Sequence, residues 1–108
     1  MPDAALPEGV ASLSSLAAYQ PGSVVSRTLV KKEKGTVTLF AFDAGQGLSE
    51  HTAPFDALVQ VLEGRASVVL GGKAHAMGAG EVLLMPANVA HSLVAVERFK
   101  MLLTMIRA

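Results

Sequence analysis

The amino-acid sequence predicts an all-β protein built as a sandwich or barrel of short strands. From residue 24 onward, roughly eight to ten apolar segments recur about every eight to twelve residues, a spacing typical of such folds. Glycine, proline and asparagine separate these segments, as expected of tight turns. No segment shows a long helical periodicity, which excludes architectures that alternate strands with helices.

The first 23 residues are predicted to form a separate N-terminal segment. Leu13, Leu16 and Ala17 have helical spacing, and Ser12 is placed to cap them, which predicts a short helical turn. Residues 20–23 contain Pro and Gly and are expected to turn the chain. We therefore divide the chain into an N-terminal segment, 1–23, and one β-domain, 24–108.

The β-domain is expected to begin with two strands joined by a charged loop at 31–35. Gly45-Gln46-Gly47, Glu63-Gly64-Arg65 and Gly71-Gly72 are turn sequences that separate later strands. The predicted strands are 24–30, 36–43, 58–62, 66–70, 73–77, 82–85, 91–96 and 99–106.

The last of these strands is apolar on both faces. A strand of this kind is expected to be buried on both sides. This pattern predicts a homodimer in which the last strand contributes to the interface. One face carries Phe99, Met101, Leu103 and Met105, and the other carries Leu102 and Ile106.

Composition limits the classes of function. The 108 residues include nine basic and nine acidic side chains, so nucleic-acid binding lacks its usual excess of positive charge. The chain has no cysteine, which excludes disulfides and thiolate chemistry. The first residues lack a basic and apolar leader, and no run is long enough for a membrane span. These features predict a cytoplasmic protein that contacts neither membrane nor nucleic acid.

Two segments each combine one histidine with turn-forming residues. In the first, Gly45 precedes His51 by six positions, and Gly64 ends the segment. In the second, Gly80 is followed by Pro86 and His91. The two segments resemble, in order and spacing, the two motifs of the cupin superfamily. The chain thus resembles a small single-domain cupin of the RmlC-like, conserved-barrel group, which implies a double-stranded β-helix, or jelly-roll barrel.

The resemblance also implies a metal site that this chain keeps only in part. Cupins of this kind hold a divalent metal such as Zn, Fe, Ni or Mn on three histidines and one glutamate. His51 and His91 match two of these positions, whereas Ala53 and Ala57 occupy the other two. Asn88 replaces a motif glycine, and asparagine tolerates the left-handed conformation that such a corner needs. Metal binding is therefore expected to be weak or partial.

A third ligand would have to come from elsewhere in the chain. Asp56 is next to Ala57, and a bulge near it would turn its side chain inward. His75 shares the parity of Met77, a predicted core residue, and could approach the cavity. Glu50 and Gln60 have the wrong parity. Alternatively, His51 and His91 are barrel histidines that simply bond to backbone carbonyls.

Three functions follow as hypotheses. The first is a small-molecule-binding domain whose cavity is marked by the two histidines and lined by Phe55, Val59, Val61 and Met85. The second is a metal-dependent dioxygenase or isomerase that acts on a small organic substrate with an altered ligand set. The third is a dimeric scaffold or regulatory protein without catalysis. The first is preferred because two ligand positions are alanine.

Overall fold

The computed structural model describes residue 6 and residues 8–107, and nearly all of its regular structure is β. This confirms the predicted all-β class. Among the described residues, no helix is long and apolar enough to span a membrane. The elements are η1 (Leu13–Leu16), β1 (Val24–Lys32), β2 (Gly35–Phe42), β3 (Gly47–His51), β4 (Asp56–Glu63), β5 (Arg65–Leu70), β6 (Lys73–Gly78), β7 (Val82–Met85), β8 (His91–Ala95) and β9 (Phe99–Ile106).

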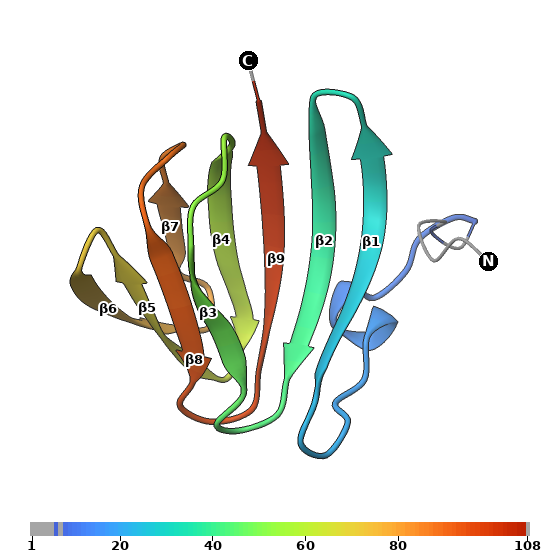
Figure 1. The fold of residues 1–108 in the computed structure, drawn as a ribbon. Coiled ribbons are helices and arrows are strands. Elements are labelled where there is room, and N and C mark those ends of the chain that lie inside the picture. Colours follow the sequence, from blue (N-terminus) through green and yellow to red (C-terminus); the bar gives the residue numbers. More distant parts are fainter. Residues whose placement is uncertain (1–5, 7, 108) are drawn as a thin grey trace.

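The strands form two sheets that pack face to face. The larger sheet has the order β1-β2-β9-β4-β7, and the smaller one has the order β3-β8-β5-β6. In Figure 1, β3 and β8 lie in front of the larger sheet, whereas β1 and β2 stand to one side. Every pair of neighbouring strands is antiparallel. The strand order makes neighbours of strands that are far apart in sequence, such as β3 and β8.

The main core lies between the sheets. Alternate residues of each strand point inward, so Val59 and Val61 of β4 face Val68 of β5 across one apolar cluster. The Phe42 and Phe99 rings stack with centroids 4.6 Å apart at the end of β2 and the start of β9. These five side chains are among the most deeply buried of the described part of the chain. Their packing holds the two sheets against each other.

A second cluster lies on the outer face of the larger sheet, under the N-terminal segment. Ala17 of this segment packs with Leu29, Leu39 and Ala41, and Leu102 of β9 borders the cluster. The second apolar face of β9 is therefore covered near Leu102 by the same chain. The alternation in β9 does not by itself require a partner subunit, since intrachain packing accounts for this part of the face.

Two details differ from the expectation. No strand was predicted at the position of β3, where only the turn Gly45-Gln46-Gly47 was expected. β3 forms because its backbone pairs with β8. The predicted short N-terminal helical turn is present as the four-residue 3-10 turn η1, but the side chain of Ser12 does not cap it. Its carbonyl instead accepts bonds from the amide and hydroxyl of Ser15.

Candidate functional site

Strand pairing brings His51 and His91 together. The two residues are direct partners in the β3–β8 ladder, as are Leu48 and Leu93. Three steps along β3 thus match two steps along β8, so β3 carries a one-residue bulge at Ser49 and Glu50. Without it, Leu48 and His51 would point to opposite faces of the sheet. The bulge is what directs both His51 and Leu48 into the same cavity.

Each imidazole is held by the backbone carbonyl two residues before it in the chain. Nδ1 of His51 lies 2.7 Å from the Ser49 carbonyl oxygen, and Nδ1 of His91 lies 3.0 Å from that of Val89. A carbonyl oxygen only accepts, so each Nδ1 is the donor. The two Nε2 atoms lie 3.0 Å apart, and the rings meet edge to face. Two nitrogens at this separation can share a proton or bind one ion from adjacent positions.

The histidines form the polar end of an otherwise apolar cavity of about 40 Å³. This volume holds about three water molecules or a small organic group. His91 is 8% exposed, whereas His51 lies at the solvent side. The lining residues are Leu48, His51, Ala53, Ala57, Met85, His91, Ser92, Leu93, Met101, Leu103 and Met105.

Only one of the four side chains predicted to line the cavity does so. Met85 lines it, as expected. Val59 and Val61 share the inward parity of Ala57, but they lie farther along β4 and are fully packed in the core. Phe55 lies before β4, where its ring faces the Arg107 guanidinium at 5.6 Å. Val59 and Val61 show that parity gives the face of a strand and not the depth along it.

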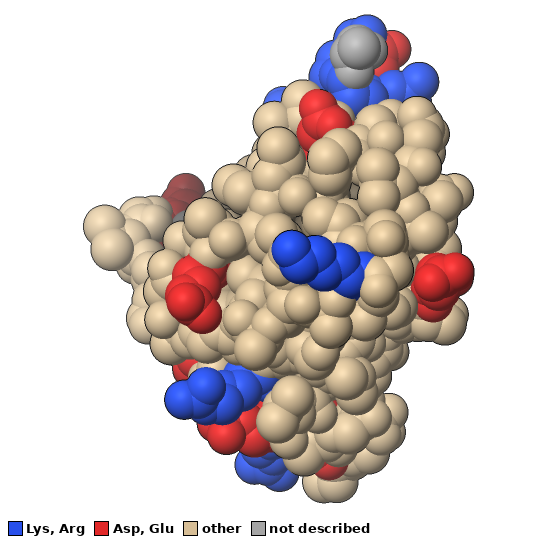
Figure 2. Space-filling view, turned by 90° about the vertical axis from the view of Figure 1, so that its left-hand side faces the viewer, with Lys and Arg blue, Asp and Glu red and all other residues tan. Residues whose placement is uncertain are grey.

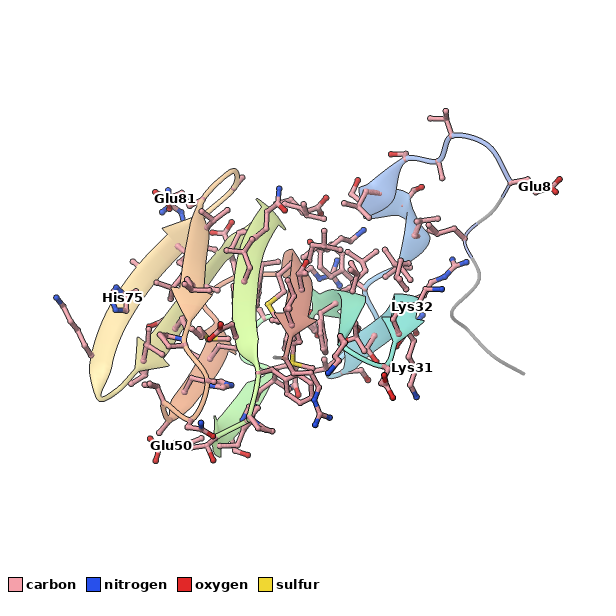
Figure 3. All side chains as sticks on the ribbon, turned by 90° about the horizontal axis from the view of Figure 1, so that it is seen from above. Glu8, Lys31, Lys32, Glu50, His75 and Glu81 are labelled. Atoms are coloured by element: carbon pink, nitrogen blue, oxygen red, sulfur yellow. The ribbon has the colours of Figure 1, made fainter. Side chains whose placement is uncertain are left out.

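His75 does not reach the histidine pair. Its partner in the β5–β6 ladder is the buried Val68, so it lies on the inner side of the sheet, as its parity predicted. However, β6 is the edge strand and is separated from β8 by β5. Two strand spacings amount to roughly 10 Å, far beyond a metal–ligand bond. Figure 3 shows His75 on β6, away from Glu50, which lies beside His51 in the sequence.

Asp56 has a structural role outside the cavity. Its Oδ1 accepts a hydrogen bond of 2.9 Å from the Ala87 amide, which ties the start of β4 to the turn before β8. Asp56 is exposed, whereas Ala57 is buried and lines the cavity, as strand alternation requires. Glu50 and Gln60 are exposed as well. No bulge turns any of these side chains toward the two histidines.

The cavity contains two imidazoles, and the described residues around it complete no metal-ligand set. In the described part of the chain, no group of three or more His, Cys, Asp or Glu side chains could hold a metal ion. Catalytic zinc sites keep three protein ligands, and structural ones keep four. Ala53 and Ala57 line the cavity with methyl groups that cannot coordinate. The residues present therefore do not fit the four-ligand site that the resemblance implies.

The turn before β8 shapes the rim of the cavity. Asn88 has φ +66°, and it is the only non-glycine residue of the described chain in the left-handed region. Its amide donates a 2.8 Å hydrogen bond to the carbonyl of Ala53, a lining residue. Asn88 thus adopts the left-handed conformation that was expected at this corner. The corner holds the segment between β3 and β4 against the start of β8.

Most residues of the cavity wall were not predicted from the sequence. Met101, Leu103 and Met105 were recognised as one face of the last strand and interpreted as core. The structure shows that this face continues from the core into the cavity. Leu48 and Leu93 were also missed. Leu93 shares the parity of His91 on β8. The placement of Leu48 on the same face as His51 depends on the bulge in β3, which no residue pattern indicated.

Comparison with known proteins agrees with this architecture. The family model described as "Cupin domain" matches residues 38–106. A conserved protein of unknown function from Streptococcus pyogenes is 31% identical with a TM-score of 0.92, and the match covers 97% of this chain and 92% of that one. A cupin superfamily protein from Desulfitobacterium hafniense is 26% identical with a TM-score of 0.91, covering 100% and 99%.

A third similar structure is a cupin 2 conserved barrel domain protein from Leptotrichia buccalis. It is 38% identical with a TM-score of 0.85, and the match covers 88% of this chain but 46% of that longer chain. No protein of curated function matches the sequence. The similar proteins therefore establish the fold and family without indicating a ligand.

Proposed function

The chain belongs to the cupin domain family, and we propose that it is a small-molecule-binding domain whose ligand enters the cavity beside His51 and His91. The observation that carries this proposal is the lining of the cavity. Two imidazoles meet at one end, and Leu, Met and Ala side chains form most of the rest. An apolar pocket with a few convergent polar groups is the usual form of a small-molecule site.

The two alanines support binding over metal-dependent chemistry. Ala53 and Ala57 stand where the resemblance implies metal ligands, and both line the cavity. Their small side chains leave space at the positions where a ligand set would be completed. We therefore propose that purified protein carries well under one metal ion per chain. Elemental analysis that finds about one Zn, Fe, Ni or Mn per chain would favour the metal-dependent alternative.

A cavity-filling variant tests the binding proposal. Butyramide, a neutral four-carbon probe, is titrated calorimetrically into the wild-type protein and into Ala57→Val. The wild type should bind it weakly and Ala57→Val should not, because two added methyl groups occupy the cavity while valine suits a β-strand. Equal heats from both proteins would place the probe elsewhere and contradict the proposal. Ala76→Val on the exposed edge strand β6 is the matched control.

We also propose that two copies of the chain associate through the outer face of β4, β7 and β9. Leu58 and Leu84 are partners in the β4–β7 ladder and share this face with Val82 and Ile106. All four are exposed, at 39% to 59%. The side of the molecule in Figure 2 shows isolated charges separated by uncharged surface. A second copy would bury the apolar stripe that the N-terminal segment leaves uncovered.

A further inference from the structure

We propose that Met105 is an oxidation site through which a peroxide controls ligand binding in the cavity. Oxidation converts its thioether into a sulfoxide and so weakens the binding of the ligand. This inference rests on the small-molecule function proposed above and names a regulation of the same site. Three observations lead to it: the exposure of Met105, its position in the cavity wall, and the apolar character of that wall.

Met105 differs from the other described methionines in its exposure. Met77, Met85 and Met101 are buried, at 5%, 3% and 1% exposed, whereas Met105 is half-buried. The chain has no cysteine, so thioethers are its only sulfur groups. Susceptibility of such groups to oxidation follows their exposure. Among the methionines that the structure describes, Met105 is therefore the first that a peroxide reaches.

Strand pairing places Met105 in the cavity wall. Its partner on β4 is Ala57, whose partner on β7 is Met85, so the three residues form one row across the larger sheet. Directly paired residues of an antiparallel ladder share a face, and all three residues line the cavity. The row thus carries one accessible thioether, at Met105, and one buried thioether, at Met85.

The oxidation transfers one oxygen atom to Met105. The sulfur attacks hydrogen peroxide, the O–O bond breaks, and an S–O bond forms. Sulfur loses two electrons, and the peroxide is reduced to water, which carries away both hydrogens. The product is a polar sulfoxide in place of an apolar thioether.

A sulfoxide at Met105 takes up space that the ligand needs. The cavity of about 40 Å³ holds about three water molecules, so an added oxygen atom displaces about one of them. Apart from His51, His91 and Ser92, the lining is apolar, and a polar group against such a wall is costly unless it is hydrogen-bonded. The oxygen therefore disturbs the apolar wall or fills the polar end beside the histidines. Both positions weaken ligand binding.

Methyl NMR of methionine-labelled protein under limiting hydrogen peroxide tests the oxidation site. The Met105 methyl resonance should move to its sulfoxide position before the resonances of Met77, Met85 and Met101 change. Earlier oxidation of any of these three would overturn the assignment. Met1 lies outside the described residues, and Met105→Leu treated in parallel isolates the effect of its oxidation.

Butyramide titrations before and after oxidation test the control of binding. Oxidation of the wild type should weaken binding about fivefold or more, as expected for a polar group without a partner. Met105→Leu has no thioether at this position, so its affinity should be the same before and after peroxide treatment. Met77→Leu makes the same substitution at a core methionine that does not line the cavity, and it should lose affinity on oxidation as the wild type does.

Unchanged affinity of the oxidised wild type would overturn the control of binding, and so would a loss of affinity in oxidised Met105→Leu. Methionine sulfoxide reductases for both epimers should restore the affinity of the oxidised wild type. An affinity that stays low would show that peroxide acts through another group. Failure of the untreated protein to bind butyramide would contradict the binding proposal and the control of binding with it, whereas the order of oxidation would still decide the oxidation site.

Discussion

At the scale of single residues, the site depends on a few positions whose backbone conformation is unusual. Asn88 adopts φ +66°, and its backbone N–H donates a hydrogen bond to the Ala53 carbonyl oxygen. The bulge at Ser49 and Glu50 turns His51 inward. Neither feature involves the ligand directly. Both decide where the two imidazoles and the cavity rim lie, so the site is built by backbone geometry as much as by side-chain identity.

Replacement of Asn88 by alanine should therefore reduce stability more than replacement by glycine. Asn88→Ala should lower the free energy of unfolding by roughly 1 kcal/mol, because a Cβ without a local polar group disfavours the left-handed region. Asn88→Gly should stay close to wild type, since glycine adopts this conformation without strain. Urea unfolding of the three proteins measures the order. An alanine variant as stable as the glycine variant would show that the corner is not strained.

These residues also show how far the sequence could predict the site. The spacing of Gly45, His51, Pro86 and His91 was sufficient to predict the fold and the two histidines. Asp56 was a candidate third ligand on the condition of a bulge, and His75 was one because its parity points inward. Strand order, which decides whether either side chain reaches the histidines, cannot be read from parity. His75 has the right parity but lies on an edge strand, two strands from His91. Long-range pairing, and not local pattern, determined which residues meet.

At the scale of elements, the N-terminal segment acts as a cover that is fastened by polar contacts. The Tyr19 hydroxyl donates a 2.7 Å hydrogen bond to Glu63 at the end of β4. The buried Lys100 ammonium donates to the Ser14 carbonyl and lies 4.9 Å from the Tyr19 ring centroid. Lys100 is adjacent to Met101, whose side chain lines the cavity on the opposite face of β9. The cover and the cavity thus share one strand.

Tyr19→Phe should lower the free energy of unfolding by about 1 kcal/mol, because the hydrogen bond to Glu63 is lost while the ring remains. Tyr19→Leu should cost more, since the ring contacts with Lys100 and Arg98 are lost as well. Thermal or urea unfolding measures both. Equal stability of the wild type and the phenylalanine variant would show that the hydroxyl does not fasten the segment.

The same tyrosine gives a pH dependence. Burial, together with the hydrogen bond to Glu63, raises the pKa of Tyr19 above its ordinary value of 10.0. A raised pKa means that its stabilising contribution is complete below pH 10 and is lost as the pH rises through the folded-state pKa. The stability difference between wild type and Tyr19→Phe should therefore shrink in strong alkali. A difference that grows above pH 10 would contradict this assignment.

At the scale of the whole molecule, the larger sheet has one outer face with two different halves. The N-terminal segment covers the half over β1 and β2, including Leu39 and Ala41. The half over β4 and β7 exposes Leu58 and Leu84. The apolar alternation of the last strand predicted a dimer, but a sequence pattern does not divide such a face between intrachain and intermolecular contacts. The division depends on where the N-terminal segment packs.

Leu84→Lys should convert the proposed dimer into a monomer, because a charge would be buried at the centre of the apolar stripe. Sedimentation equilibrium measures the mass. Val96→Lys introduces the same charge at an exposed valine outside the stripe and should leave the dimer intact. A monomeric wild-type protein, or a dimer that survives Leu84→Lys, would show that this face is not the interface.

The central claim is that the cavity beside His51 and His91 is the ligand site, and methyl NMR of methionine-labelled protein tests it most directly. Met85, Met101 and Met105 line the cavity, whereas Met77 lies in the core and does not. On titration with butyramide, the three lining methyl resonances should shift together along one saturation curve while Met77 stays in place. Lining methyl resonances that do not move, or a Met77 shift as large as theirs, would contradict the account.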